Sequence, residues 1–113
     1  MDEDTREFVT PDIEKRQHRR AKLITQVRCQ ALGREAVLLT RDVSVGGMFV
    51  NTQEPFPADS VVSLAYRLDP IAPLFTCQGK VAYAIQGLGM GVMFTDLSEE
   101  VRQALQKFVD EAN

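Results

Sequence analysis

The hydrophobic and polar positions of this chain alternate from about residue 20 onward, a pattern that predicts β-strands. Leu23, Thr25, Val27 and Cys29 are spaced two apart within residues 22–29. A repeat of two is typical of a half-buried strand. Similar short runs, bounded by segments rich in Gly and Pro, predict five more strands, the last but one with a bend near Gly79. These are residues 35–43, 48–50, 61–68, 74–85 and 90–94.

The C-terminal segment changes to a helical repeat. Ser98 is suited to cap a helix, and Glu99 and Glu100 would occupy its favourable first turn. One hydrophobic stripe follows, made of Val101, Leu105, Phe108 and Ala112. Six short strands and one terminal helix indicate a mainly-β fold, an antiparallel barrel or sandwich that the helix plugs or flanks.

Length and composition fit one ordinary globular domain in a chain of 113 residues. No apolar run approaches the roughly 18 residues that span a bilayer, and the N-terminus lacks the basic start of a secretory signal. We therefore expect a cytoplasmic protein without membrane insertion. Cys29 and Cys77 are expected to be reduced core residues. The single His, with no Cys-x-x-Cys pair, argues against a metal site.

Charge is distributed unevenly along the chain. Residues 1–14 carry six acids and one base, residues 15–41 eight bases and one acid, and residues 42–113 nine acids and four bases. We expect an acidic N-terminal tail over residues 1–13 and one domain over residues 14–113. One compact basic segment in an acidic protein favours a small anionic ligand over a nucleic-acid polymer, which is usually met by a broad basic face.

Two short motifs carry polar groups suited to a ligand. Arg16 and Arg20 form Arg-x-x-x-Arg just before the first predicted strand. The second motif, Asp-x-Ser-x-Gly-Gly, joins the second and third strands, and its residues are Asp42, Ser44, Gly46 and Gly47. Taken singly, the arginines could be a solvated charge cluster. The second motif could be a turn whose Asp and Ser bond their own backbone.

The chemistry of these side chains fits a guanine nucleotide. A guanidinium pairs with phosphate through two parallel bonds, matches guanine O6 and N7, and stacks on purines. Asp42 can accept hydrogen bonds from guanine N1–H and N2–H. Ser44 either donates to a phosphate or holds its loop. Gly46 and Gly47 allow backbone torsions closed to other residues and let a ligand approach the main chain.

Both motifs, in this order and at this spacing, resemble those of the PilZ domain. The resemblance covers roughly residues 14–110, and the segment 89–94 (GMGVMF) is similar to the family's last barrel strand. It implies a six-stranded antiparallel PilZ-type β-barrel with a C-terminal α-helix, and cyclic di-GMP as the ligand. It also implies that Arg16, Arg20 and the Asp42–Gly47 loop form the binding site.

The resulting expectation is a receptor and not an enzyme, because no nucleophile–base pair, Walker loop or metalloprotease motif is present. Ligand binding would change the conformation of the arginine segment and signal to an unidentified protein partner. The receptor would be a monomer or a weak homodimer. The alternative is a PilZ-like interaction subunit of pilus or flagellar control that works without nucleotide.

Overall fold

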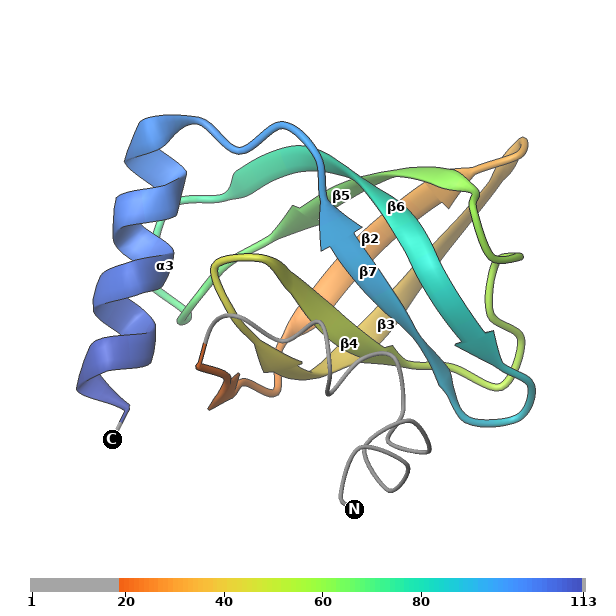
Figure 1. Ribbon diagram of the computed structural model, residues 1–113, viewed down its shortest axis with the longest axis horizontal. Helices are drawn as coiled ribbons and strands as arrows, with labels where there is room; N and C mark the ends of the chain where they lie inside the picture. Colours follow the sequence, from red (N-terminus) through yellow and green to blue (C-terminus); the bar gives the residue numbers. More distant parts are fainter. Residues whose placement is uncertain (1–18, 113) are drawn as a thin grey trace, which may run out of the picture.

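Figure 1 shows the computed structural model, which describes residues 19–112. Strands dominate this part of the chain, and one helix follows them. The elements are β1 (Ala21–Lys22), β2 (Gln26–Ala31), β3 (Arg34–Val43), β4 (Gly47–Asn51), β5 (Val61–Tyr66), β6 (Phe75–Ile85), β7 (Gly89–Phe94) and α3 (Glu99–Glu111). No helix within residues 19–112 is both long enough and apolar enough to cross a bilayer.

Six of these strands close into an antiparallel barrel. Their order is β3-β2-β5-β6-β7-β4, and the pairing of β4 with β3 completes the ring. The short β1 adds to the end of β3, where Ala21 faces Val43 and Lys22 faces Asp42. Closure matters because it leaves the ring without an unpaired edge. The expectation of a six-stranded barrel with a C-terminal helix is confirmed.

The first predicted strand is interrupted. Residues 23–25 lie between β1 and β2, opposite only Thr40 and Arg41 of β3, so the pairing carries one extra residue. The Thr40 side chain bridges the gap, because its hydroxyl donates to Leu23 O and accepts from Thr25 N. The alternation itself was predicted correctly, since Leu23, Val27 and Cys29 are buried.

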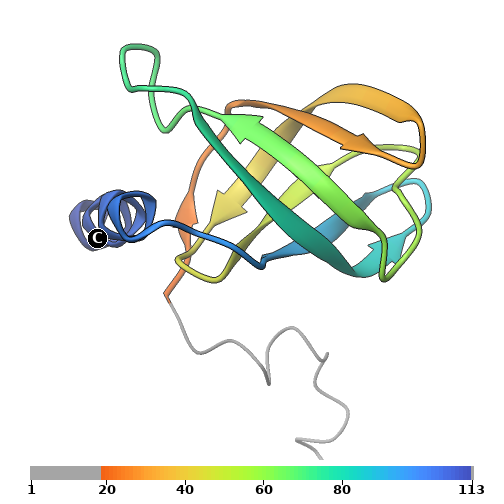
Figure 2. The same ribbon diagram turned by 90° about the horizontal axis from the view of Figure 1, so that it is seen from above.

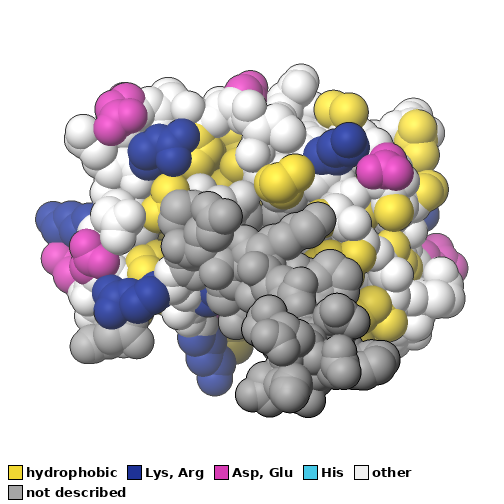
Figure 3. Space-filling view, in the orientation of Figure 1, with side chains coloured by type: hydrophobic (Ala, Val, Ile, Leu, Met, Phe, Trp, Pro, Cys, Tyr) yellow, Lys and Arg dark blue, Asp and Glu magenta, His cyan; other side chains and the backbone are white. Residues whose placement is uncertain are grey.

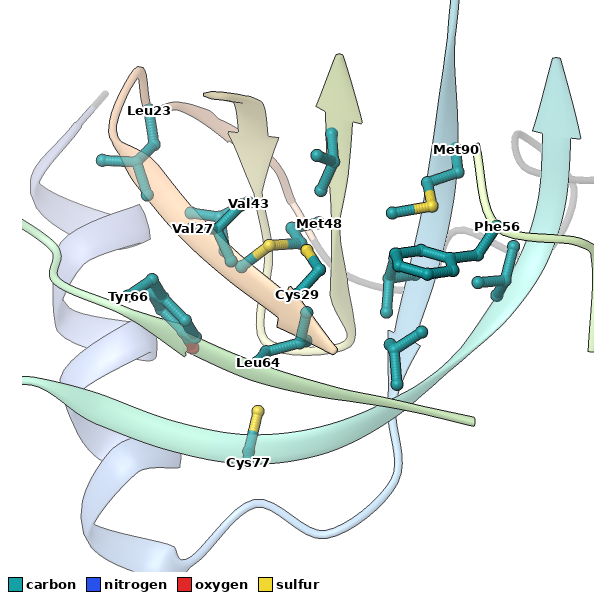
Figure 4. Packing of buried hydrophobic residues seen from close by; sticks show 14 of the residues in the cluster. Leu23, Val27, Cys29, Val43, Met48, Phe56, Leu64, Tyr66, Cys77 and Met90 are labelled. Carbon is teal, nitrogen blue, oxygen red and sulfur yellow. The ribbon is translucent and has the colours of Figure 1, made fainter. Parts of the chain in front are cut away.

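The barrel interior is filled by inward-facing strand residues and by Phe56, which comes from a segment expected to be only a loop (Figure 4). Val62, Leu64, Tyr66 and Leu68 are all buried, as their spacing predicted. Cys29 and Cys77 are buried free thiols. Burial raises the pKa of Cys29 to about 12 and, with a contribution from the Asp96 carboxylate, that of Cys77 to about 11.

The core prediction for Met93 differs from the structure. Met48 and Met90 are core residues as expected, but Met93 is 49% exposed, because the outer face of β7 is not covered at that position. The irregularity of β6 falls at Ala82, where its pairing with β7 shifts. At Gly79, where the sequence predicts a bend, the pairing of β6 with β5 continues without a shift.

The helix α3 flanks the barrel and does not plug it (Figures 1 and 2). Ser98 caps it as predicted, accepting a 3.2 Å hydrogen bond from Val101 N. Leu105 is fully buried against the barrel core, but the stripe continues to Val109, and Ala112 is exposed. Val101 and Phe108 of the predicted stripe are partly buried against the same core, so the prediction holds for them and was wrong for Ala112.

Candidate functional site

The two sequence motifs meet at one end of the barrel. Because β1 pairs with the end of β3, Arg20 is brought beside Asp42, 22 positions later. Arg20 Nε lies 2.7 Å from Asp42 Oδ1, and these side chains are only 17% and 18% exposed. This is a charge-assisted hydrogen bond, stronger than one between neutral groups. Arg16 and the rest of residues 1–18 lie outside the described part of the chain.

Asp42 has a second arginine partner that sequence reasoning missed. Arg41 Nε lies 2.9 Å from Asp42 Oδ2. In a regular strand, neighbours such as these point to opposite faces. Here the pairing of β3 with β4 shifts between Thr40 and Asp42, leaving Arg41 as the extra residue of a β-bulge. Bulges re-aim side chains, and a single sequence contains no clear signal for this one.

A groove of about 470 Å³ opens beside Asp42 and its two arginine partners. Its walls combine cationic and apolar side chains with the Asp42 carboxylate, and they include Arg20, Lys22, Ile24, Leu39, Arg41 and Asp42. Ile24 and Leu39 are 65% and 49% exposed. Such a groove offers both charge for an anion and exposed apolar side chains against which a base can pack.

Ser44 shapes the loop that joins β3 to β4. Its hydroxyl oxygen accepts hydrogen bonds from Gly46 N at 3.0 Å and Gly47 N at 3.2 Å, and its own N–H donates to Gly47 O at 2.8 Å. With 2% exposure, it is enclosed by this loop. Of the two roles left open by the sequence, the contacts within residues 19–112 are those of holding the loop.

Gly46 and Gly47 do not use the left-handed torsions that glycine allows. Among the described residues, the glycines with left-handed torsions are Gly33 and Gly87, and neither Gly46 nor Gly47 is one of them. Gly47 is required by packing instead, since a Cβ built there would lie 2.1 Å from Val92 O on β7. The Gly46 carbonyl accepts a hydrogen bond from Phe94 N, which ties the loop to the same strand.

The charged side chains on the face shown in Figure 3 are dispersed. On the described part of the face in Figure 3, Lys and Arg side chains lie apart, with acidic side chains among them, and form no continuous basic surface. Within residues 19–112, no three His, Cys, Asp or Glu side chains are grouped as metal ligands would be. The site is therefore described by its arginines, its carboxylate and the Ser44 loop.

Solved structures with the same fold come from several bacteria. The Bacillus subtilis inhibitor of motility (MotI/DgrA) superposes with a TM-score of 0.76 at 19% identity, over 86% of this chain and 50% of that one. The PilZ domain of YcgR from Escherichia coli, described with c-di-GMP, gives 0.69 at 13% identity, over 87% of this chain and 91% of that one. The Borreliella burgdorferi PlzA protein, described in complex with c-di-GMP, gives 0.63 at 15%, over 86% of this chain and 42% of that one.

At these identities the structural likeness shows the fold alone, and the chain spans half the length of the Bacillus subtilis protein. None of the curated proteins matches the chain. The family is shown by sequence instead, because the model of the PilZ domain matches residues 14–111, nearly the whole chain. That match includes both motifs, the six strands of the closed barrel and the flanking helix, and it establishes that the chain belongs to the PilZ domain family.

Proposed function

We propose that this protein is a receptor for cyclic di-GMP and has no catalytic activity of its own. The observation that carries the proposal is the 2.7 Å contact between Arg20 and Asp42, because it unites the two motifs at one groove. The YcgR domain and PlzA, which share the fold, are described with this ligand. Their likeness supports the choice of ligand, and the residues of this chain supply its chemistry.

Each side chain has a role in the proposed complex. Arg20 uses Nε for Asp42, so its terminal nitrogens can pair with a phosphate or guanine edge. Arg16, four residues earlier in the sequence, would supply the second guanidinium. Asp42 accepts from guanine N1–H and N2–H. Gly46 and Gly47 belong to the loop whose shape Ser44 holds.

Signalling would follow from a change in the arginine segment. An anion with two phosphates can pair with the terminal nitrogens of Arg20 while Nε stays on Asp42, so binding gives the segment around Arg16 and Arg20 a new set of contacts. A protein partner in the cytoplasm could then distinguish the two states, since only a differential contact transmits a signal. We propose that the receptor acts as a monomer or a weak homodimer.

Isothermal titration calorimetry of the full chain with cyclic di-GMP tests the proposal. Arg16→Ala and Arg20→Ala should each weaken binding by about 2 kcal/mol, roughly 30-fold, through loss of a bidentate charged contact. A shallow dependence of affinity on salt is expected, whereas a nucleic-acid polymer would give a steep one. If the parent chain does not bind, the proposal is wrong and the nucleotide-independent role in pilus or flagellar control becomes the better one.

A further inference from the structure

Arg41 stands outside both motifs but shares the carboxylate at their meeting point. Its Nε lies 2.9 Å from Asp42 Oδ2, while Arg20 Nε lies 2.7 Å from Oδ1. Each oxygen of Asp42 thus accepts one charge-assisted bond. We propose that Arg41 is a third arginine of the ligand site, a positioning residue that orients Asp42 toward the guanine base. This inference rests on the proposed function and deepens it.

Arg41 is held in place before any ligand arrives. Its guanidinium carbon lies 4.0 Å from the centre of the Phe49 ring, and Phe49 is only 2% exposed. Phe49 in turn packs against Tyr83, with 6.2 Å between the ring centres. An arginine fixed by a ring on one side and a carboxylate on another loses little freedom on binding, which lowers the cost of forming a complex.

The same arginine remains accessible from the groove. Arg41 lines the groove together with Arg20 and Asp42, and its side chain is 52% exposed. Within residues 19–112, its hydrogen bond to a side chain joins Nε to Asp42, so in this part of the chain Arg41 is committed to that carboxylate. Arg20 is attached to Asp42 through Nε as well. The Asp42 carboxylate therefore lies between two positively charged guanidinium groups, each of which donates to it through Nε.

The count of acceptor positions explains what the pair of arginines achieves. An ionised carboxylate has about four acceptor positions, two on each oxygen. Arg20 and Arg41 occupy one on each, which leaves two for the N1–H and N2–H donors of guanine. The last torsion of an Asp side chain is broad, so a carboxylate fixed at one oxygen only can rotate away from that alignment. Loss of Arg41 should therefore reduce both affinity and the preference for guanine over adenine.

Arg34 provides a matched control on the same strand. Its guanidinium carbon lies 4.1 Å from the centre of the Phe56 ring, and it also bonds the carbonyl of Glu54. Arg34 is the first residue of β3, and Asp42 lies near the opposite end of that strand. The Arg34→Ala variant thus loses the same charge and the same kind of ring contact, but away from the groove.

The experiment compares the dissociation constants of cyclic di-GMP and cyclic di-AMP for the full-length parent, Arg41→Ala, Arg41→Lys and Arg34→Ala. Circular dichroism and thermal unfolding verify that each variant is folded. Arg41→Ala should bind cyclic di-GMP about tenfold more weakly, the size of one charged hydrogen bond, and discriminate less against cyclic di-AMP. Arg41→Lys should lie between it and the parent, because it keeps the charge but not the planar fork. Arg34→Ala should match the parent in both constants.

A double-mutant cycle with Asp42→Asn tests whether Arg41 acts through Asp42. In the Asp42→Asn background, Arg41→Ala should weaken cyclic di-GMP binding by less than about twofold. An equal loss in both backgrounds, or an Arg41→Ala variant that binds and discriminates like the parent, overturns the inference and leaves the proposed function standing. A folded parent that binds no cyclic di-GMP overturns the proposed function and this inference with it.

Discussion

Ser44 illustrates how one side chain of a binding motif can be committed to shaping a loop. It is enclosed, and its hydroxyl accepts from Gly46 N and Gly47 N. In Ser44→Ala both N–H groups lose that partner, so the free energy of unfolding should fall by about 1–3 kcal/mol. Chemical denaturation measures the loss. Ser60→Ala is the control, because its hydroxyl bonds Pro57 O at an exposed site and should cost below about 0.5 kcal/mol.

A loss no larger than that of the control would mean that the Ser44 hydroxyl contributes nothing to the loop. Holding the loop would then be the wrong role for Ser44, and a direct contact with phosphate would be the better one. The two accounts also differ in binding. If the loop is the whole role, Ser44→Ala should weaken cyclic di-GMP binding only as far as the loop is disturbed.

Gly47 marks the place where β4 meets β7 to help close the barrel. A Cβ at this position would lie 2.1 Å from Val92 O, closer than any unstrained contact. Gly47→Ala should therefore separate the two backbones and lower stability by about 3 kcal/mol, toward the upper range for overpacking. Gly33→Ala has open space around it and only a left-handed φ of +73° to strain, so about 1 kcal/mol is expected. Equal losses in thermal unfolding of the two variants would contradict this account.

The elements were predictable where a regular repeat decides them. Alternation placed Val27, Cys29 and Leu64 correctly inside the barrel, and the change of repeat at Ser98 located the helix. Interruptions were not predictable. At the break after β1, the Thr40 hydroxyl bonds Leu23 O and Thr25 N in addition to the main-chain bonds, and no repeat contains that information.

The candidate site was predictable to a similar extent. Arg20 and Asp42 were chosen by residue type and spacing, and the pairing of β1 with β3 brings them into contact. Arg41 was missed because strand alternation assigns it to the face opposite Asp42. The bulge that reverses this assignment is a property of how β3 pairs with β4, which is decided by long-range contacts. The packing requirement at Gly47 was not predictable either, because the atom that a Cβ would meet, Val92 O, lies on β7.

The buried thiols make the stability of the whole barrel sensitive to alkaline pH. Burial raises the pKa of Cys29 from its ordinary value of 9.0 to about 12. The unfolded chain therefore releases this proton above pH 9 while the folded chain retains it. The stabilisation is complete below pH 9 and is lost as pH rises toward 12, by at most about 1.4 kcal/mol per pH unit. Cys77, with its pKa raised to about 11, adds to the loss.

Urea denaturation between pH 7 and 10.5 measures this slope. Cys29→Ala should lower stability at pH 7 through the lost packing but flatten the decline above pH 9. Val27→Ala is the matched control, since Val27 is fully buried in the same strand and carries no titrating group. It should lower stability while leaving the slope unchanged. Identical slopes for Cys29→Ala and the parent would contradict the assignment.

Hydrogen exchange across the molecule distinguishes a local response from a general one. The two residues of β1 pair only with β3, at Val43 and Asp42, so this pairing is short and depends on the contacts around it. A ligand held by Arg20 and Asp42 would clamp both sides of that pairing. We expect cyclic di-GMP to slow exchange in β1, while β6 and β7, each paired on two sides of the closed ring, change little. Uniform slowing in every strand would instead indicate global stabilisation by mass action. If the β1 amides exchange equally with and without bound ligand, the ligand does not stabilise the pairing of β1 with β3.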